Sequence, residues 1–167
     1  MMRAALMLAA VVGGMVSPAS ALAEPPAPWI SLTRTECFGT CPVFTLRVFA
    51  DGRVAYKGER FVIRRGLVRS RISAGKLEAL RQAVAKAGYA TLDEKCCNCP
   101  SRTDAPSTYL EIADGAASKA IHHYHGCLSA PVAVSDLEDE IISTAGATRW
   151  IGTEAERSRQ KWKRGSR

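Results

Sequence analysis

Alternating apolar and polar residues predict β-strands with one buried face, because successive side chains of a strand point to opposite sides. The predicted strands cover residues 29–34, 43–50, 54–56, 61–63, 67–68, 108–113 and 119–125. Asp51-Gly52 and Asp114-Gly115 are strong two-residue hairpin signals, since Gly accepts the positive φ that such turns need. Arg65-Gly66 gives a weaker signal of the same kind. The pattern predicts antiparallel strands joined by short turns.

Two other stretches repeat apolar residues every three or four positions, which is typical of a helix with one face on a core. The first begins at Ser73, a good N-cap, and ends at Gly88. The second begins at Pro131 and ends at Gly146. Their apolar stripes are Leu77, Leu80, Val84 and Ala87, then Val134, Leu137 and Ile141. We interpret residues 138–140, which are all acidic, as the solvated face of the second helix.

The predicted order is strands, helix, strands, helix, and it contains no spacing suited to parallel crossovers. We therefore predict an α+β domain, an antiparallel sheet of hairpins with two helices packed on one face. The expected divisions are a signal peptide at 1–23, a proline-rich leader at 24–28, a single domain at 29–152 and a basic C-terminal tail at 153–167.

The first 23 residues have the three parts of a secretory signal. Arg3 supplies the positive charge, residues 4–16 form an apolar run, and Ala21-Leu22-Ala23 matches the pattern that signal peptidase cleaves. The apolar run is shorter than the ~20 residues that a spanning helix needs. We therefore expect a mature chain that is periplasmic or secreted and not transmembrane after cleavage.

The net charge of +7 is unevenly distributed. Residues 149–167 hold seven Lys/Arg and two Glu, whereas residues 24–148 hold fifteen basic and fourteen acidic residues. The nearly neutral domain argues against a nucleic-acid partner. The tail has two interpretations: a solvated end without fixed structure, or weak contact with an anionic envelope surface, with Trp162 as an interfacial anchor.

The six cysteines of an exported chain predict disulfides, although six cysteines allow 15 pairings. Cys37 and Cys41 would lie about 13 Å apart on an extended chain, so a bridge between them needs a turn, which Gly39 permits. Cys-x-x-x-Cys-Pro is also the ligand pattern of copper chaperones with a thioredoxin fold. In those proteins a helix follows the motif, whereas here we predict a strand after Pro42.

A second group of cysteines and histidines has two interpretations. Its members are Cys96, Cys97, Cys99, His123, His125 and Cys127. In the first interpretation one cysteine, by preference Cys99, forms a disulfide with Cys127, the strand histidines are exposed, and no cofactor is needed. The adjacent Cys96 and Cys97 are too constrained to favour pairing with each other. In the alternative interpretation these six residues bind copper or zinc, or act in thiol redox chemistry.

No catalytic residues are predicted. Asp104 lies in a turn before a strand, where one carboxylate most often caps its own backbone. The sequence contains no nucleophile elbow, phosphate loop or His-Glu-x-x-His motif. The favoured hypothesis is a non-enzymatic binding or envelope-associated module. Its expected ligand-facing surface lies near residues 37–42, Asp104 and His123.

Several of these features together resemble an uncharacterised bacterial family, domain of unknown function 6438. The most specific is Cys-Phe-Gly-Thr-Cys-Pro at 37–42. Later landmarks are Asp51-Gly52, Thr103-Asp104-Ala105-Pro106, His123-Tyr124, and the helix from Pro131 to the Trp150 region. The resemblance covers roughly residues 29–152. It implies a fold and an envelope location, and it brings no activity or catalytic residues.

Overall fold

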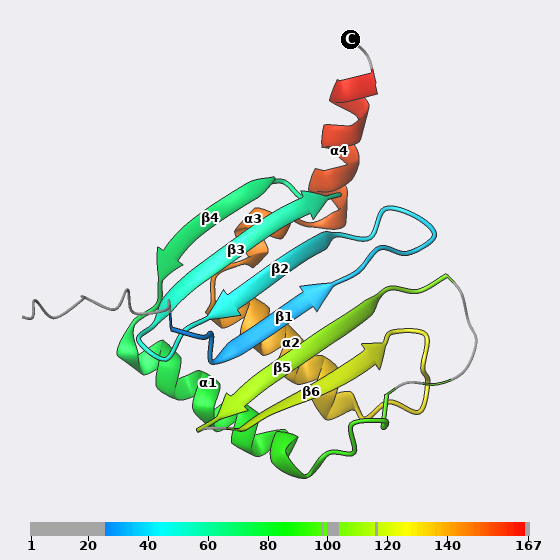
Figure 1. The fold of residues 1–167 in the computed structure, drawn as a ribbon. Coiled ribbons are helices and arrows are strands. Elements are labelled where there is room, and N and C mark those ends of the chain that lie inside the picture. Colours follow the sequence, from blue (N-terminus) through cyan, green and yellow to red (C-terminus); the bar gives the residue numbers. More distant parts are fainter. Residues whose placement is uncertain (1–25, 98, 100–103, 116, 166–167) are drawn as a thin grey trace, which may run out of the picture.

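Six strands form one antiparallel sheet in the order β4-β3-β2-β1-β5-β6 (Figure 1). The strands are β1 Ile30–Arg34, β2 Val43–Val48, β3 Arg53–Arg60, β4 Gly66–Arg71, β5 Ser107–Asp114 and β6 Ala117–Tyr124. The structure is a computed structural model that describes residues 26–97, 99, 104–115 and 117–165. The predicted signal peptide at 1–23 lies outside these residues, as does Thr103.

Two long helices, α1 (Ala74–Lys86) and α2 (Val132–Thr144), cover one face of the sheet (Figure 1). A 3-10 turn at Tyr89–Thr91 follows α1, and two further helices, α3 (Thr148–Ile151) and α4 (Glu154–Gly165), follow α2. The prediction of an α+β fold with an antiparallel sheet and two helices on one face is confirmed.

Because successive side chains of a strand point to opposite faces, the apolar residues of neighbouring strands form rows that face the helices. On β1, Ile30 and Leu32 are fully buried, and Leu32 lies opposite Leu46 of β2 and Leu110 of β5. The helix stripes close this layer with Leu80, Leu137 and other apolar residues. Burying one such side chain contributes about 1.5–3 kcal/mol, so these rows supply most of the driving force that fixes the register.

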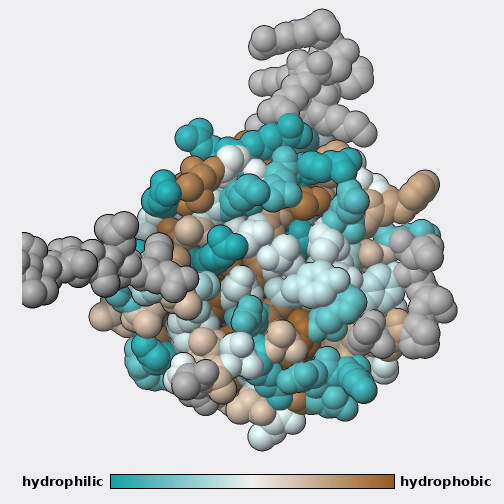
Figure 2. All heavy atoms as spheres, in the orientation of Figure 1, coloured by the Kyte–Doolittle hydropathy of each residue, from teal (hydrophilic) through white to brown (hydrophobic). Residues whose placement is uncertain are grey.

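The opposite face of the sheet carries no helix in the described part of the chain, and Figure 2 shows mostly hydrophilic side chains on it. Alternation explains this, because most of the residues between the buried ones are polar or charged, as at Thr45, Arg47 and Lys57. Tyr109 stacks there on His122 with ring centroids 4.6 Å apart. We call this surface the open face.

The β2–β3 hairpin turns at Asp51 and Gly52, as predicted. Gly52 has a φ of 82°, and a Cβ there would lie 2.8 Å from the carbonyl oxygen of Ile72. Ile72 in turn donates its N–H to the carbonyl of Gly52 at 2.9 Å. Only glycine fits this position, because it needs both a left-handed backbone and close approach of another chain segment.

The predicted strand at 61–63 is wrong, because these residues form a loop that packs on α3. Phe61 has a φ of 50°, which interrupts the strand, and Val62 turns into the core with 3% exposure. The N–H groups of Ile63 and Arg64 donate to carbonyls of α3, at 3.1 and 2.8 Å. Apolar content alone suggested a strand, whereas the structure uses it to attach a hairpin to a helix.

One end of the sheet holds the β1–β2, β3–β4 and β6–α2 connections. It consists of residues 35–42, 61–65, 104–106 and 125–131, and we call it the loop end (Figure 1). α4 begins beside it and extends away from the sheet. The interpretation of the tail as an end without fixed structure therefore differs from the structure, which is helical from Glu154 to Gly165.

Among the described residues, no helix is both long enough and apolar enough to cross a membrane.

Candidate functional site

A carboxylate, that of Glu138, is buried between the sheet and α2. Its residue is 0% exposed, and the sheet beneath it contributes Arg34, Thr108 and His123. His125, just beyond the end of β6, completes the group. We call these five residues the Glu138 cluster.

Strand register brings three members of the cluster into one row. Arg34 of β1 lies opposite Thr108 of β5, and Thr108 lies opposite His123 of β6. All three side chains point to the helix-covered face, on which Leu32 and Leu110 also lie. This row occupies the last buried position before the loop end. Polar groups at this position can be reached from outside the molecule.

The carboxylate of Glu138 is surrounded by hydrogen-bond donors. Oε1 lies 2.8 Å from Nδ1 of His123. Oε2 accepts from Thr108 Oγ1 at 3.0 Å and from Arg34 Nη2 at 3.1 Å, and it lies 3.3 Å from Nε2 of His125. A buried charge is tolerated only when it is paired and hydrogen-bonded in this way.

The donors decide the protonation of Glu138. Burial by itself would raise the pKa of its carboxyl, but hydrogen bonds from His123 and His125 and the charge of Arg34 outweigh burial and lower the pKa to about 2. Burial also lowers the pKa of Arg34, against the opposing influence of Glu138. Glu138 is therefore ionised at any physiological pH.

An ionised carboxylate only accepts hydrogen bonds, and this fixes which imidazole nitrogen donates to it. His123 must donate from Nδ1. Thr108 donates its hydroxyl proton to Glu138, so its oxygen accepts from His125 Nε2 at 2.8 Å. Both rings are thereby oriented, with their centroids 4.3 Å apart.

The six cysteines form three pairs at disulfide distance. Cys37 pairs with Cys41 at a Cα–Cα distance of 5.7 Å, and Cys99 with Cys127 at 5.3 Å. The third pair joins the adjacent Cys96 and Cys97. The sequence analysis expected this pairing to be disfavoured. A turn at residues 94–97 brings the two sulfurs together, which an extended chain would not do.

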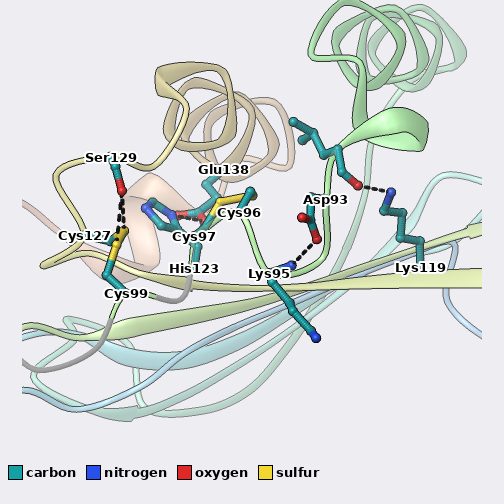
Figure 3. Close-up of a disulfide and its surroundings, with 11 residues drawn as sticks. Asp93, Lys95, Cys96, Cys97, Cys99, Lys119, His123, Cys127, Ser129 and Glu138 are labelled. Atoms are coloured by element: carbon teal, nitrogen blue, oxygen red, sulfur yellow. Dashed lines mark hydrogen bonds and ion pairs between the residues drawn. A yellow bond between two sulfur atoms is a disulfide. The ribbon is translucent and has the colours of Figure 1, made fainter.

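In this disulfide-bonded structure, the cysteines and the histidines of the alternative metal hypothesis therefore do not form one site. Paired cysteines offer no thiolate, whereas His123 and His125 meet at Glu138. Figure 3 shows the hydrogen bond between His123 and Glu138, with two disulfides drawn nearby. Cys97 comes close to this strand through its carbonyl, which accepts from the N–H of Tyr124 at 2.9 Å.

The surface expected to face a ligand is only partly assembled. Residues 37–42 do meet Asp104, because the N–H of Phe38 donates to the carbonyl of Asp104 at 3.3 Å. His123, by contrast, is 2% exposed and lies beneath this surface. The expectation of exposed strand histidines is wrong for His123 because the alternation of β6 turns it inward, towards Glu138.

Phe38 is the most prominent feature of the loop end. It sits inside the ring closed by the Cys37–Cys41 disulfide, and it is 89% exposed. Figure 2 shows hydrophobic atoms projecting at the margin where Figure 1 places the β1–β2 loop. Leu128, next to Cys127 in the β6–α2 connection, is equally exposed. Apolar side chains are normally left exposed singly, so two on disulfide-pinned loops at one end are notable.

Basic side chains gather beside the same end. Arg64 and Arg65 of the β3–β4 loop are exposed, as are Arg149 of α3 and Arg159 of α4. The backbone bonds between this loop and α3 bring together residues more than 80 positions apart in the chain. We call these four residues the basic cluster. The sequence analysis assigned the positive charge to the tail alone and missed the contribution of the loop.

The interpretation of Glu138 as part of a solvated face is wrong, and Arg34 and Thr108 were not predicted as site residues. A signal was present for Glu138, because about 100° of rotation per residue places it only about 40° from Val134 on the buried stripe. Arg34 shares the period-two face of Ile30 and Leu32. Their meeting depends on strand order, which a hydropathy pattern does not contain.

The comparisons with known proteins agree with the resemblance described above. No curated protein matches the sequence. Residues 28–145 match the model of a family described as a domain of unknown function (DUF6438). The match spans the whole sheet, α1 and α2, and it ends before α3 and α4. The chain therefore belongs to the DUF6438 family.

Proposed function

We propose that this chain is an exported, disulfide-stabilised, non-enzymatic module whose loop end docks reversibly on an anionic membrane surface of the cell envelope. Export is supported by the signal-like residues 1–23 and by the pairing of every cysteine, which suits an oxidising compartment. Each part of the docking surface is taken in turn below.

Phe38 is the apolar part of this surface. The Cys37–Cys41 disulfide closes a ring of five residues and limits the backbone conformations of the loop that carries Phe38. A loop that is already ordered pays less entropy on binding. Moving an exposed Phe into an apolar environment contributes about 1.5–3 kcal/mol, which is enough to anchor the loop in the headgroup region.

The basic cluster is the electrostatic part. Each Lys or Arg near an anionic bilayer contributes about 1 kcal/mol, and the attraction decays within a Debye length of about 10 Å at 0.1 M salt. The two adjacent arginines of the β3–β4 loop, Arg64 and Arg65, therefore contribute about 2 kcal/mol together. Together with Phe38 this predicts weak, reversible binding that falls steeply as salt is added.

One observation carries the proposal: residues from three distant parts of the chain bring apolar and basic side chains to the same end of the sheet. The β1–β2 loop lies beside the β3–β4 end through the ion pair of Glu36 with Arg60, and the β3–β4 loop is bonded to α3. A fold that needed these residues only for stability would not leave Phe38 exposed.

Vesicle co-sedimentation tests the proposal. The Arg64→Glu/Arg65→Glu variant should lower the fraction bound to phosphatidylglycerol vesicles at least tenfold at 0.1 M salt. The matched control is Arg47→Glu/Arg69→Glu, which changes the net charge equally but on the open face, and it should stay within twofold of the wild type. Equal loss in both variants, or binding to neutral phosphatidylcholine as strong as to the anionic lipid, would reject docking through the loop end.

The apolar contribution is measured separately. Phe38→Ala should weaken binding at least tenfold at every salt concentration, because it removes area rather than charge. Tyr109→Ala is the control. It removes a half-exposed aromatic ring from the open face and should not change binding. Unchanged binding in Phe38→Ala would remove Phe38 from the proposed surface.

Export is tested by intact mass spectrometry of the protein made in a Gram-negative host. The mature chain should begin at Glu24 and weigh six hydrogens less than the reduced sequence. A chain that keeps Met1, or that carries free thiols, would contradict export into an oxidising compartment.

A further inference from the structure

We propose that His123, His125 and Glu138 form a binding site for a divalent transition metal ion of the zinc and copper class. A nitrogen of each imidazole and a carboxylate oxygen of Glu138 lie within 4.8 Å of one another. Two imidazoles and one carboxylate are the donor set of many open zinc sites, and imidazole selects such metals over magnesium or calcium. This proposal is independent of membrane docking.

The spacing of the donor atoms suits a small ion. Metal bonds of about 2.0–2.1 Å at a tetrahedral angle place two donor atoms about 3.3 Å apart. The separation of His125 Nε2 from Glu138 Oε2 is already 3.3 Å, and that of His123 Nδ1 from Oε1 is 2.8 Å. The three donor atoms lie within 4.8 Å of one another, so an ion would draw them together by up to about 1.5 Å.

Metal binding requires each imidazole to carry its proton on the nitrogen that faces away from the ion. An imidazole that binds metal through one nitrogen carries its proton on the other. His123 would move its proton from Nδ1 to Nε2, and His125 from Nε2 to Nδ1. Thr108, which now lies 2.8 Å from His125 Nε2, would keep its bond to Glu138 and help to hold the carboxylate in place.

An ion can reach the site from the side of His125. The side chains of Glu138 and His123 are 1% and 3% exposed, whereas that of His125 is 22% exposed. His125 lies beyond the last residue of β6, so its side chain closes the cluster at the loop end. Residue 125 can move more easily than the two buried ligands, as the outermost ligand of an entry path must.

Arg34 opposes the ion and sets its affinity. Its Nη2 contacts Oε2 of Glu138 at 3.1 Å, and among the described residues its buried Nε has no hydrogen-bond partner. The guanidinium therefore contacts this carboxylate through Nη2, and an ion bound by Glu138 lies close to its positive charge. A positive charge this close repels a divalent cation, so we expect micromolar rather than nanomolar affinity.

Titration calorimetry with zinc chloride tests the site, using disulfide-bonded protein without a polyhistidine tag at pH 7.5. The wild type should bind one Zn²⁺ per chain, and His125→Gln should bind at least tenfold more weakly. His122→Gln is the matched control, because His122 is the third histidine of the chain and lies on the open face. The control should bind within twofold of the wild type.

Either of two calorimetric results would overturn the site: no zinc binding at 100 µM protein, or equal affinity of the wild type and His125→Gln. Arg34→Met should bind zinc at least tenfold more tightly, because it removes the opposing charge, and weaker binding would contradict an ion beside that guanidinium. Wild-type protein loaded with Cu²⁺ should show nitrogen hyperfine coupling in its electron paramagnetic resonance spectrum. A spectrum with oxygen ligands alone would also reject the assignment.

Discussion

Replacing Glu138 by Gln should destabilise the domain strongly at neutral pH. The change removes the buried charge and leaves Arg34, whose side chain is 15% exposed, without its counter-ion. The loss can be calculated from the pKa of the carboxyl, which folding lowers from 4.5 to about 2. At about 1.4 kcal/mol per pH unit this corresponds to about 3 kcal/mol. Breaking a buried ion pair by removing one partner costs about 3–5 kcal/mol, which agrees.

The sign of the pH dependence follows from the same numbers. A folded-state pKa below the unfolded value means that the contribution of Glu138 is fully present above pH 4.5 and is lost as the pH falls through about 2. The variant lacks this group. Wild type and Glu138→Gln should therefore differ by about 3 kcal/mol at pH 7 and converge towards pH 2.

Urea unfolding in the presence of EDTA, at a series of pH values from 7 to 2, measures both effects on metal-free protein. In a thermal unfolding experiment at pH 7, the midpoint of Glu138→Gln should lie about 10 °C below that of the wild type. Asp136→Asn is the matched control, because it removes a charge from an exposed position of α2 and should change stability by less than about 0.5 kcal/mol. A gap that stays constant from pH 7 to pH 2, or no gap at pH 7, would refute the assignment of an ionised buried carboxylate.

The disulfides should differ in their contributions, because a longer closed loop constrains the unfolded chain more. The Cys99→Ser/Cys127→Ser variant, which opens a sequence separation of 28, should lose about 3.5 kcal/mol, and Cys37→Ser/Cys41→Ser, with a separation of 4, about 2 kcal/mol. Urea unfolding checks the order, and a larger loss from the shorter loop would contradict it. Tyr89→Phe should cost about 1–2 kcal/mol by the same assay, because the buried hydroxyl contacts two strand carbonyls at 2.7 and 2.8 Å. An unchanged unfolding midpoint would show that this hydroxyl is dispensable.

Hydropathy predicted those parts of the fold whose neighbours lie close in sequence. The hairpin at Asp51-Gly52 and the start of α1 at Ser73 depend on local turn and cap chemistry, and both appear as expected. The segment at 61–63 failed because its apolar residues serve a contact with α3, about 90 positions later. A local pattern shows that a residue is apolar but not which element it packs against.

The Glu138 cluster shows the same limit more sharply. Arg34, Thr108 and His123 come from three strands that are neighbours only because β1 lies at the centre of the sheet and pairs with β5. The sequence shows the inward period of each residue separately. A glutamate on the edge of an apolar helix stripe carries the same information whether it meets solvent or a buried arginine, and only the assembled sheet decides which.

Docking of the loop end on anionic membranes is tested most directly by amide hydrogen exchange, measured by mass spectrometry with and without phosphatidylglycerol vesicles. The proposal predicts slower exchange on binding in residues 36–42, 61–65 and 153–159, with no change in α1 or in the strands. Slower exchange across the open face, or none at the loop end while the protein is bound, would contradict it.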